Sequence, residues 1–389
     1  MEVKPGYKLT EVGVIPDEWK VRSIGQVLRL VNGCAFKPED WKLTGTPIIR
    51  IQNLNDPLAP FNYSQGAVPE RNRVACGDLL FAWSGTLGSS FGARLWHGPS
   101  GVLNQHIFKV HMDDRQITLP FSLLVFGRVE EDIAKQAHGF KASFVHVKKA
   151  DLVKVWLPVP PLLEQDAIAS VIGDVNALLS GLDRLIAKKR DLKQAAMQQL
   201  LTGQTRLPGF QGEWEVQQLG EVAHIKTGSR NNEDKVADGG YPFFVRSEHV
   251  ERINSYSHDC EAILVPGEGR IGSIFHYING RFDVHQRVYA ITQFSSAVSG
   301  RFVHLCMSYR FGAWAMQNTV KATVDSLRLP TFETFEVSLP PTLEEQTAIA
   351  TVFSDMDDEL TALEARRDKT RALKQAMMQE LLTGKTRLI

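Results

Sequence analysis

The stretch LKQAAMQQLLTGQTRL (Leu192–Leu207) returns almost unchanged near the end of the chain as LKQAMMQELLTGKTRL (Leu373–Leu388). The likeness extends upstream, where each copy follows a double proline, an acidic residue and a glutamine, in Pro160–Gln165 and Pro340–Gln346. Self-similarity at a fixed offset is the sequence signature of a duplicated structural unit. A chain of 389 residues is long enough for two domains, so we predict that one unit is used twice.

The segments in front of these stretches repeat more faintly. The matching pairs are Glu18–Gly25 with Glu213–Gly220, Pro47–Arg50 with Pro242–Val245, Gly77-Asp78 with Gly267-Glu268, Asn104–His106 with His285–Arg287, and Lys141-Ala142 with Lys321-Ala322. The unit is therefore a variable body, a double proline and a nearly invariant tail. Because the tails are alike and the bodies differ, we assign a shared task to the tails and different targets to the bodies.

Each tail is predicted to be one long helix, because its apolar residues recur at intervals of three and four. The stripe comprises Ile168, Ile172, Val175, Leu179, Leu182, Ile186, Ala196 and Leu200, passing through Lys189 and Lys193, and in the second copy Ile349, Val352, Phe353, Met356, Leu360, Leu363, Leu373, Met377 and Leu381. About 40 residues give a helix of roughly 60 Å. Gly203 and Gly384 follow the last apolar residues and are predicted to end the helices.

An apolar stripe on a long helix must be buried against something. The sequence leaves two partners open: the other helix, in an antiparallel coiled coil, or the body that precedes each helix. Between Leu182 and Leu207 stand six basic and two acidic residues, and between Leu363 and Leu388 seven and three. This basic excess suits a strip that faces DNA or a partner, or an ordinary solvated helix face.

Both bodies are predicted to be α+β, with a curved sheet and short helices. The predicted strands are Gly45–Ile51, Asp78–Trp83, Gln105–Val110, Ala262–Val265 and Arg287–Thr292, followed by helices around Phe121–Gln136 and Ser299–Gln317. The expected domains are a first body at 1–160, a helix at 161–206, a second body at 207–341 and a helix at 342–389. Together they form a pseudo-two-fold internal repeat.

Composition narrows the class of protein. The 44 basic and 44 acidic residues cancel, which is mild evidence against DNA binding by global charge and leaves room for a local basic surface. There is no apolar run long enough for a membrane span and no apolar segment near the N-terminus typical of a signal peptide. The four cysteines stand far apart, without a C-x-x-C pair, which fits a reducing cytoplasm.

Several short motifs resemble catalytic elements but lack the necessary context. Gly267–Gly272 matches G-x-G-x-x-G yet leads toward a strand-like segment rather than a helix. Gly384–Thr386 resembles the end of a P-loop, but no strand precedes it. In Pro16–Lys20 the acidic residues of a nuclease-like pattern are adjacent, and Asn104–His106 has no second histidine at metal-ligand spacing. We predict no catalytic residue and no metal site.

The repeat, the P-P-x-x-E-Q helix entry and the L-L-T-G-x-T-R-L ending make the chain strongly similar to the specificity subunits of type I restriction–modification enzymes. The resemblance spans nearly the whole length and is most specific at Pro160–Leu207 and Pro340–Leu388. It implies two target recognition domains, each reading one half of a bipartite, asymmetric double-stranded DNA site. The long helices are then expected to fix the spacer and to dock two methyltransferase (modification) subunits.

The resemblance also implies where the chemistry lies. S-adenosylmethionine is expected on the methyltransferase subunits, and ATP and Mg²⁺ on restriction (translocase) subunits reached through the complex, with no cofactor bound by this chain. The chain itself is expected to be non-catalytic, cytoplasmic and not associated with membranes.

Base reading favours Arg, Lys, Asn, Gln, Ser and Thr on loops or strand ends. In the first body the predicted DNA-binding residues are Arg50, Gln52, Asn53, Ser84, Lys141 and Ser143. In the second they are Arg230, Arg246, Ser247, Arg270, Lys321 and Thr323. Trp19 and Trp214 are better interpreted as core anchors. Two alternatives stay open at this point: a coiled-coil scaffold without DNA sequence preference, and a stand-alone nuclease or hydrolase.

Overall fold

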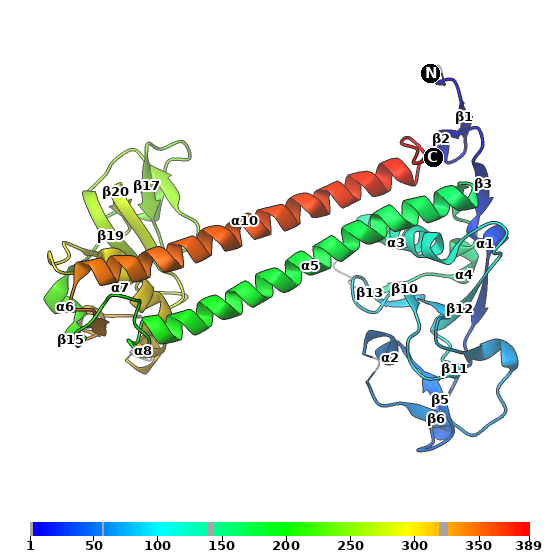
Figure 1. Ribbon diagram of the computed structural model, residues 1–389, viewed down its shortest axis with the longest axis horizontal. Helices are drawn as coiled ribbons and strands as arrows, with labels where there is room; N and C mark the ends of the chain where they lie inside the picture. Colours follow the sequence, from blue (N-terminus) through cyan, green and yellow to red (C-terminus); the bar gives the residue numbers. More distant parts are fainter. Residues whose placement is uncertain (1–2, 57, 138–143, 319–325) are drawn as a thin grey trace. The chain divides into compact units, whose positions relative to one another are not determined.

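The computed structural model describes residues 3–56, 58–137, 144–318 and 326–389 (Figure 1). The chain divides into two compact units: unit 1 comprises Met1–Gly181 and Arg367–Ile389, and unit 2 comprises Leu182–Arg366. Two helices of 39 residues, α5 (Leu162–Leu200) and α10 (Leu343–Leu381), run from one unit into the other. Each unit therefore holds one body, the first part of one long helix and the last part of the other.

Unit 2 is built on a six-stranded sheet in the order β16-β21-β19-β20-β17-β18. Its strands are β16 (His224–Thr227), β17 (Tyr241–Phe244), β18 (Glu251–Ile253), β19 (His258–Pro266), β20 (His276–Val284) and β21 (Val288–Thr292). Alternate residues of β19 enter two cores: Ile263 and Val265 join a large core with the helices, and Ala262 and Leu264 join a smaller one on the other face.

Helices cover one face of this sheet. The predicted helix at 299–317 is α7 (Gly300–Cys306), a π-helical turn (Met307–Phe311) and α8 (Gly312–Gln317) in succession. Short elements complete the unit: β15 (Glu215–Gln218) pairs with β22 (Glu336–Leu339), and α6 (Leu219–Val222) and α9 (Leu329–Glu333) lie beside them. Trp214 packs partly buried against this core, as predicted.

In unit 1 the corresponding strands form two four-stranded sheets, β10-β8-β12-β4 and β6-β5-β11-β7. The bounds are β4 (Leu28–Asn32), β5 (Thr46–Ile49), β6 (Asn62–Ser64), β7 (Arg73–Val74), β8 (Leu79–Ala82), β10 (Gly92–Leu95), β11 (Gly101–Leu103) and β12 (Ile107–Met112). The single strand β20 of unit 2 corresponds to two strands in unit 1, β10 and β11, because the segment Trp96–Ser100 separates them. There the Trp96 indole donates to the Pro99 carbonyl (2.8 Å), and proline offers no N–H for a ladder.

The remaining elements of unit 1 position its core. The predicted helix at 121–136 is α3 (Leu119–Ala137), and β3 (Lys20–Ser23) pairs with β14 (Trp156–Val159). The short elements are β1 (Tyr7–Thr10), β2 (Gly13–Pro16), α1 (Ile24–Val27), α2 (Ile51–Asn55), β9 (Ser84–Thr86), β13 (Phe144–His146) and α4 (Lys149–Leu152). The predicted strand ending at Ile51 stops at Ile49, because Ile51 begins α2. Trp19 is fully buried, as predicted.

Strand register confirms most of the faint repeat. Ile48 opposite Val102 corresponds to Phe243 opposite Asp283, which aligns the two proline-led strands as predicted. The match of Gly77-Asp78 with Gly267-Glu268 is wrong. Trp83 N–H donates to the His106 carbonyl and Gly267 N–H to the Arg287 carbonyl, so the residues equivalent to Gly267-Glu268 are Trp83-Ser84. The Lys141-Ala142 and Lys321-Ala322 match lies outside the described residues.

The long helices pack antiparallel. In unit 2, Lys189 lies 2.7 Å from Glu359, and Lys193 pairs with Asp357, so the partner number falls as the residue number rises. The predicted stripe of α5 is buried or half-buried at every position. Leu373 is an exception in α10, because it is 55% exposed and the seam passes through Lys374 instead.

The structure also shows what packs against the helices and which acidic residues pair with some of their basic side chains. The core of each unit contains the start of one long helix and the end of the other, with Ile168 and Leu381 in one and Phe353 and Leu200 in the other. Both partners considered from the sequence therefore contribute. Four of the six basic residues counted between Leu182 and Leu207 pair with acidic residues of α10: Lys189, Arg190, Lys193 and Arg206.

The helices end at Leu200 and Leu381, and each predicted glycine closes the turn that follows. Gly203 has φ +72° and Gly384 has φ +70°, a left-handed conformation that costs a residue with a Cβ about 1–2 kcal/mol. A Cβ on Gly203 would stand 3.3 Å from the Trp214 ring, whereas one on Gly384 would collide with the Pro16 ring.

We expect Gly384→Ala to destabilise unit 1 more than Gly203→Ala destabilises unit 2. Thermal unfolding of both variants measures this, and equal losses would contradict it.

Candidate functional site

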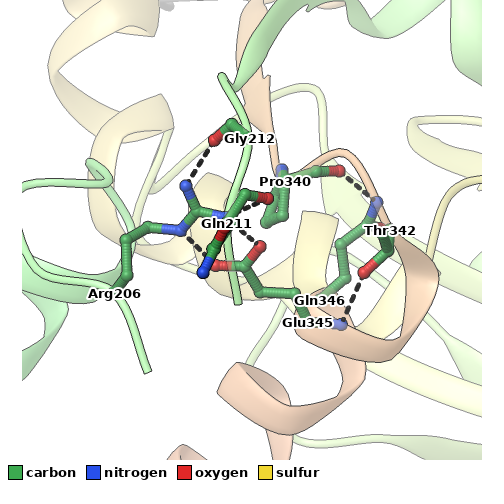
Figure 2. Close-up of polar contacts among 7 residues, drawn as sticks. All are labelled: Arg206, Gln211, Gly212, Pro340, Thr342, Glu345 and Gln346. Atoms are coloured by element: carbon green, nitrogen blue, oxygen red, sulfur yellow. Dashed lines mark hydrogen bonds and ion pairs between the residues drawn. The ribbon is translucent and has the colours of Figure 1, made fainter. Parts of the chain in front are cut away.

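The motifs that mark the repeat meet each other in space. In unit 2, Arg206, from the ending of the first tail, lies against Glu345, at the start of α10 (Figure 2). Its Nε and Nη2 each lie 2.5 Å from one oxygen of that carboxylate. Arg206 also donates to the carbonyls of Gln211 (3.2 Å) and Gly212 (2.5 Å), and it lies over the Trp214 ring. A fully buried carboxylate is thus neutralised by a guanidinium from the other repeat.

Unit 1 contains the same junction with the roles exchanged. Arg387, from the ending of the second tail, places Nε 2.5 Å from Glu164 Oε1 at the start of α5. The other oxygen of Glu164 accepts the Trp19 indole N–H at 2.9 Å, and Arg387 reaches exposed Glu18 at 3.1 Å. In unit 2 the Trp214 indole nitrogen is buried without a hydrogen-bond partner among the described residues. Hydrogen bonding to these carboxylates raises the pKa of both arginines.

The glutamine that follows each buried glutamate fastens the helix to its body. Gln165 accepts from the Thr118 N–H (2.8 Å) and donates to the carbonyls of Gln116 (2.8 Å) and Pro160 (2.9 Å). Gln346 does the same with Ser299 N–H (2.8 Å), Ala297 (3.0 Å) and Pro340 (3.2 Å). The P-P-x-x-E-Q and T-R-L motifs therefore lock helix starts, helix ends and bodies together.

The sequence did not reveal the pairing of these motifs. The repeated glutamates and arginines are visible in the sequence. A repeat alone, however, gives no indication that Arg206 pairs with Glu345 rather than with Glu164, which is nearer in the sequence. The pairing follows from antiparallel helices, which bring the end of one tail to the start of the other.

The predicted DNA-binding residues of the first body have different environments. Arg50 is half-buried, bonds to Asn62 (2.9 Å) and lies over the Trp41 ring, and Gln52 is exposed on α2. Asn53 is fully buried, where its side chain accepts from the Arg50 N–H and donates to the Ala59 carbonyl. Ser84 is buried at the start of β9. Lys141 and Ser143 lie outside the described residues.

In the second body, four of the predicted residues lie at the ends of β16, β17 and β19. Arg246 and Arg270 are exposed and pair with Glu268 (3.2 Å) and Glu248 (2.8 Å). Arg230 pairs with the buried Asp283 at 3.1 Å, and the Ser247 hydroxyl donates to the His249 carbonyl at 2.7 Å. Lys321 and Thr323 lie outside the described residues. Each of these three arginines is thus paired with a carboxylate, and their side chains remain 41–68% exposed.

Within residues 3–56, 58–137, 144–318 and 326–389, no three His, Cys, Asp or Glu side chains gather as metal ligands. The same described residues contain no helix long and apolar enough to cross a membrane.

The two-fold repeat of a strand-rich body joined to a long helix defines a class of protein that presents two related but different surfaces. Residues 16–188 and 211–371 match the family model "Type I restriction modification DNA specificity domain". The chain belongs to this family and is a DNA-recognition subunit of the type I restriction–modification class.

Relatives agree with this assignment, and solved structures share the fold. The chain is 24% identical to the putative type I restriction enzyme MjaX specificity subunit of Methanocaldococcus jannaschii, over 98% of this chain and 97% of that protein. It is 23% identical to the MjaVIII specificity subunit of the same organism, over 96% and 94%. The crystal structure of the S subunit from M. genitalium superposes with a TM-score of 0.62 at 16% identity, covering 98% of both chains. The HsdS subunit from Thermoanaerobacter tengcongensis gives 0.50 at 16%, over 96% and 98%.

Proposed function

We propose that the two bodies read the two halves of a bipartite DNA site and that the chain performs no chemistry itself. Target recognition domains are assigned to 1–160 and 207–341, and spacer helices to 161–206 and 342–389. The observation that carries the proposal is the contrast between the nearly identical segments Leu192–Leu207 and Leu373–Leu388 and the dissimilar bodies. Bodies that share strand register but differ in side chains are suited to different half-sites.

The helices are proposed to dock two methyltransferase subunits, one on each repeat, because each repeat offers the same kind of surface. The methyl donor S-adenosylmethionine belongs to those subunits, and ATP with Mg²⁺ belongs to the restriction subunits. Co-purification with the methyltransferase of the same system tests this. A mixture that forms no complex and methylates no specific site would overturn it. Sequence-independent DNA binding by a complex that does form would favour the scaffold alternative.

The helices are also proposed to set the spacer between half-sites. Seven residues inserted in α5 after Gly181 and seven in α10 after Arg366 preserve the 3.5-residue seam and add about 10 Å to each helix. Since duplex DNA rises about 3.4 Å per base pair, we expect a spacer about three base pairs longer with unchanged half-sites. Mapping methylated sites measures this. An unchanged spacer would contradict the ruler, and altered half-sites would contradict the separation of roles.

A further inference from the structure

The G-x-G-x-x-G segment after β19, set aside as a nucleotide loop, forms a tight corner at the edge of unit 2. Gly267 packs where a Cβ would stand 2.9 Å from the Tyr289 ring. Gly269 and Gly272 have φ of +91° and +66°, which favour glycine. Glu268 is fixed between these glycines, because it forms a β-bridge with Ser326. The glycines and the bridge therefore fix the backbone from which one acidic side chain extends.

This carboxylate is surrounded by arginines. Glu268 Oε2 lies 3.2 Å from Arg246, and Oε1 lies 3.3 Å from Arg287. The glutamate side chain is 25% exposed, whereas the two arginines are 52% and 60% exposed, so their donors stay accessible. Burial, and to a smaller extent the charges of Arg246 and Arg287, lower the pKa of the neighbouring His285, and the charge of Glu268 opposes this shift.

The equivalent corner of unit 1 has different chemistry. Strand register aligns Glu268 with Ser84, Arg287 with His106 and Arg246 with Ile51, and these three positions carry neither a carboxylate nor a guanidinium. Instead, the Trp83 ring lies 4.7 Å from the His146 ring and 5.2 Å from the His106 ring. One backbone framework thus presents an ionic corner in unit 2 and an aromatic corner in unit 1.

A carboxylate on a surface that meets DNA is repelled by phosphates, so it weakens binding unless it meets a donor. In the major groove the donors are the amino groups of cytosine N4 and adenine N6, and glutamate accepts well from cytosine. Arginine donates to O6 and N7 of the guanine in the same pair. We propose that Glu268 and Arg287 read one C·G base pair in the half-site of unit 2, with Arg246 holding the carboxylate in place. This inference rests on the proposed division of the DNA site between the bodies.

Glu268→Gln and Glu268→Ala test this in the complex with the methyltransferase subunits, using a library of DNA sites. Glutamine pairs with adenine N6 and N7. We expect Glu268→Gln to shift one C·G position to A·T, and Glu268→Ala to relax that position, lowering the preference for C·G by about 10- to 100-fold. Arg287→Ala should relax the same position. Glu248→Gln, which changes another arginine-paired carboxylate nearby, should leave the base preference at that position unchanged.

The outcomes are distinct. Unchanged specificity, a uniform loss across all sequences, or a change in the half-site of unit 1 would overturn the inference. Co-purification and melting temperature of each variant separate lost folding from lost reading, and Glu268→Gln, nearly isosteric, keeps the test valid if the alanine variant unfolds. A wild-type complex without a bipartite site would instead overturn the proposed function.

Discussion

Arg387→Ala is expected to lower the free energy of unfolding of unit 1 by about 3 kcal/mol, and its Tm by roughly 10 °C. The reason is that the variant leaves Glu164, which is 0% exposed, without the guanidinium that neutralises it. The indole of Trp19 alone then faces a buried charge. Thermal or chemical unfolding of the intact chain, followed by a probe in unit 1, measures the loss.

Two variants locate the source of that loss. Glu18→Ala removes only the exposed partner of Arg387. Because the Glu18 side chain is 71% exposed, this variant should lower the free energy of unfolding by less than about 1 kcal/mol. The double variant Arg387→Ala with Glu164→Gln removes the buried charge but keeps an acceptor for Trp19, so it should be more stable than Arg387→Ala alone. A single variant as stable as wild type, or a double variant no better than the single one, would contradict the junction.

Exchange of one body is expected to replace one half-site completely. The segment to be replaced is 215–339. This choice keeps the paired strands β15 and β22 within one exchanged segment. It also leaves Arg206, Trp214 and Glu345 of the junction unchanged. Proteins bind their specific DNA sites about 10³-fold or more tightly than non-specific DNA. The exchanged protein should therefore lose nearly all its preference for the original second half-site. Mapping of methylated sites measures both halves at once.

The first half-site is the internal control of this exchange, because unit 1 is untouched. The reciprocal exchange of the first body should leave the second half-site intact. If one exchange altered both half-sites, the bodies would not read independently.

Local periodicity was sufficient to predict the long helices. The seam of α5 passes through Lys189 and Lys193, which a 3.5-residue repeat requires even though both are charged. In α10 the same 3.5-residue spacing places Lys374, and not Leu373, in the seam. The ends at Gly203 and Gly384 were also predictable, because their conformation is a local property.

Long-range register was harder to predict. Gly77-Asp78 and Gly267-Glu268 match in letters, but hydrogen bonds align the latter pair with Trp83-Ser84, which differ in chemistry. Asn53 suited base reading by residue type, yet it is buried and caps its own helix turn. Type and loop position could not distinguish these roles, since they depend on which groups the fold leaves buried.

We expect that one chain directs modification to a bipartite site through two different bodies. The most direct measurement is single-molecule sequencing of adenine methylation in cells that express this chain with its methyltransferase subunit, compared with cells that lack this chain. We expect one new methylated motif with two dissimilar specific segments separated by an unspecific spacer of fixed length. No new motif, or a contiguous motif without a spacer, would contradict it.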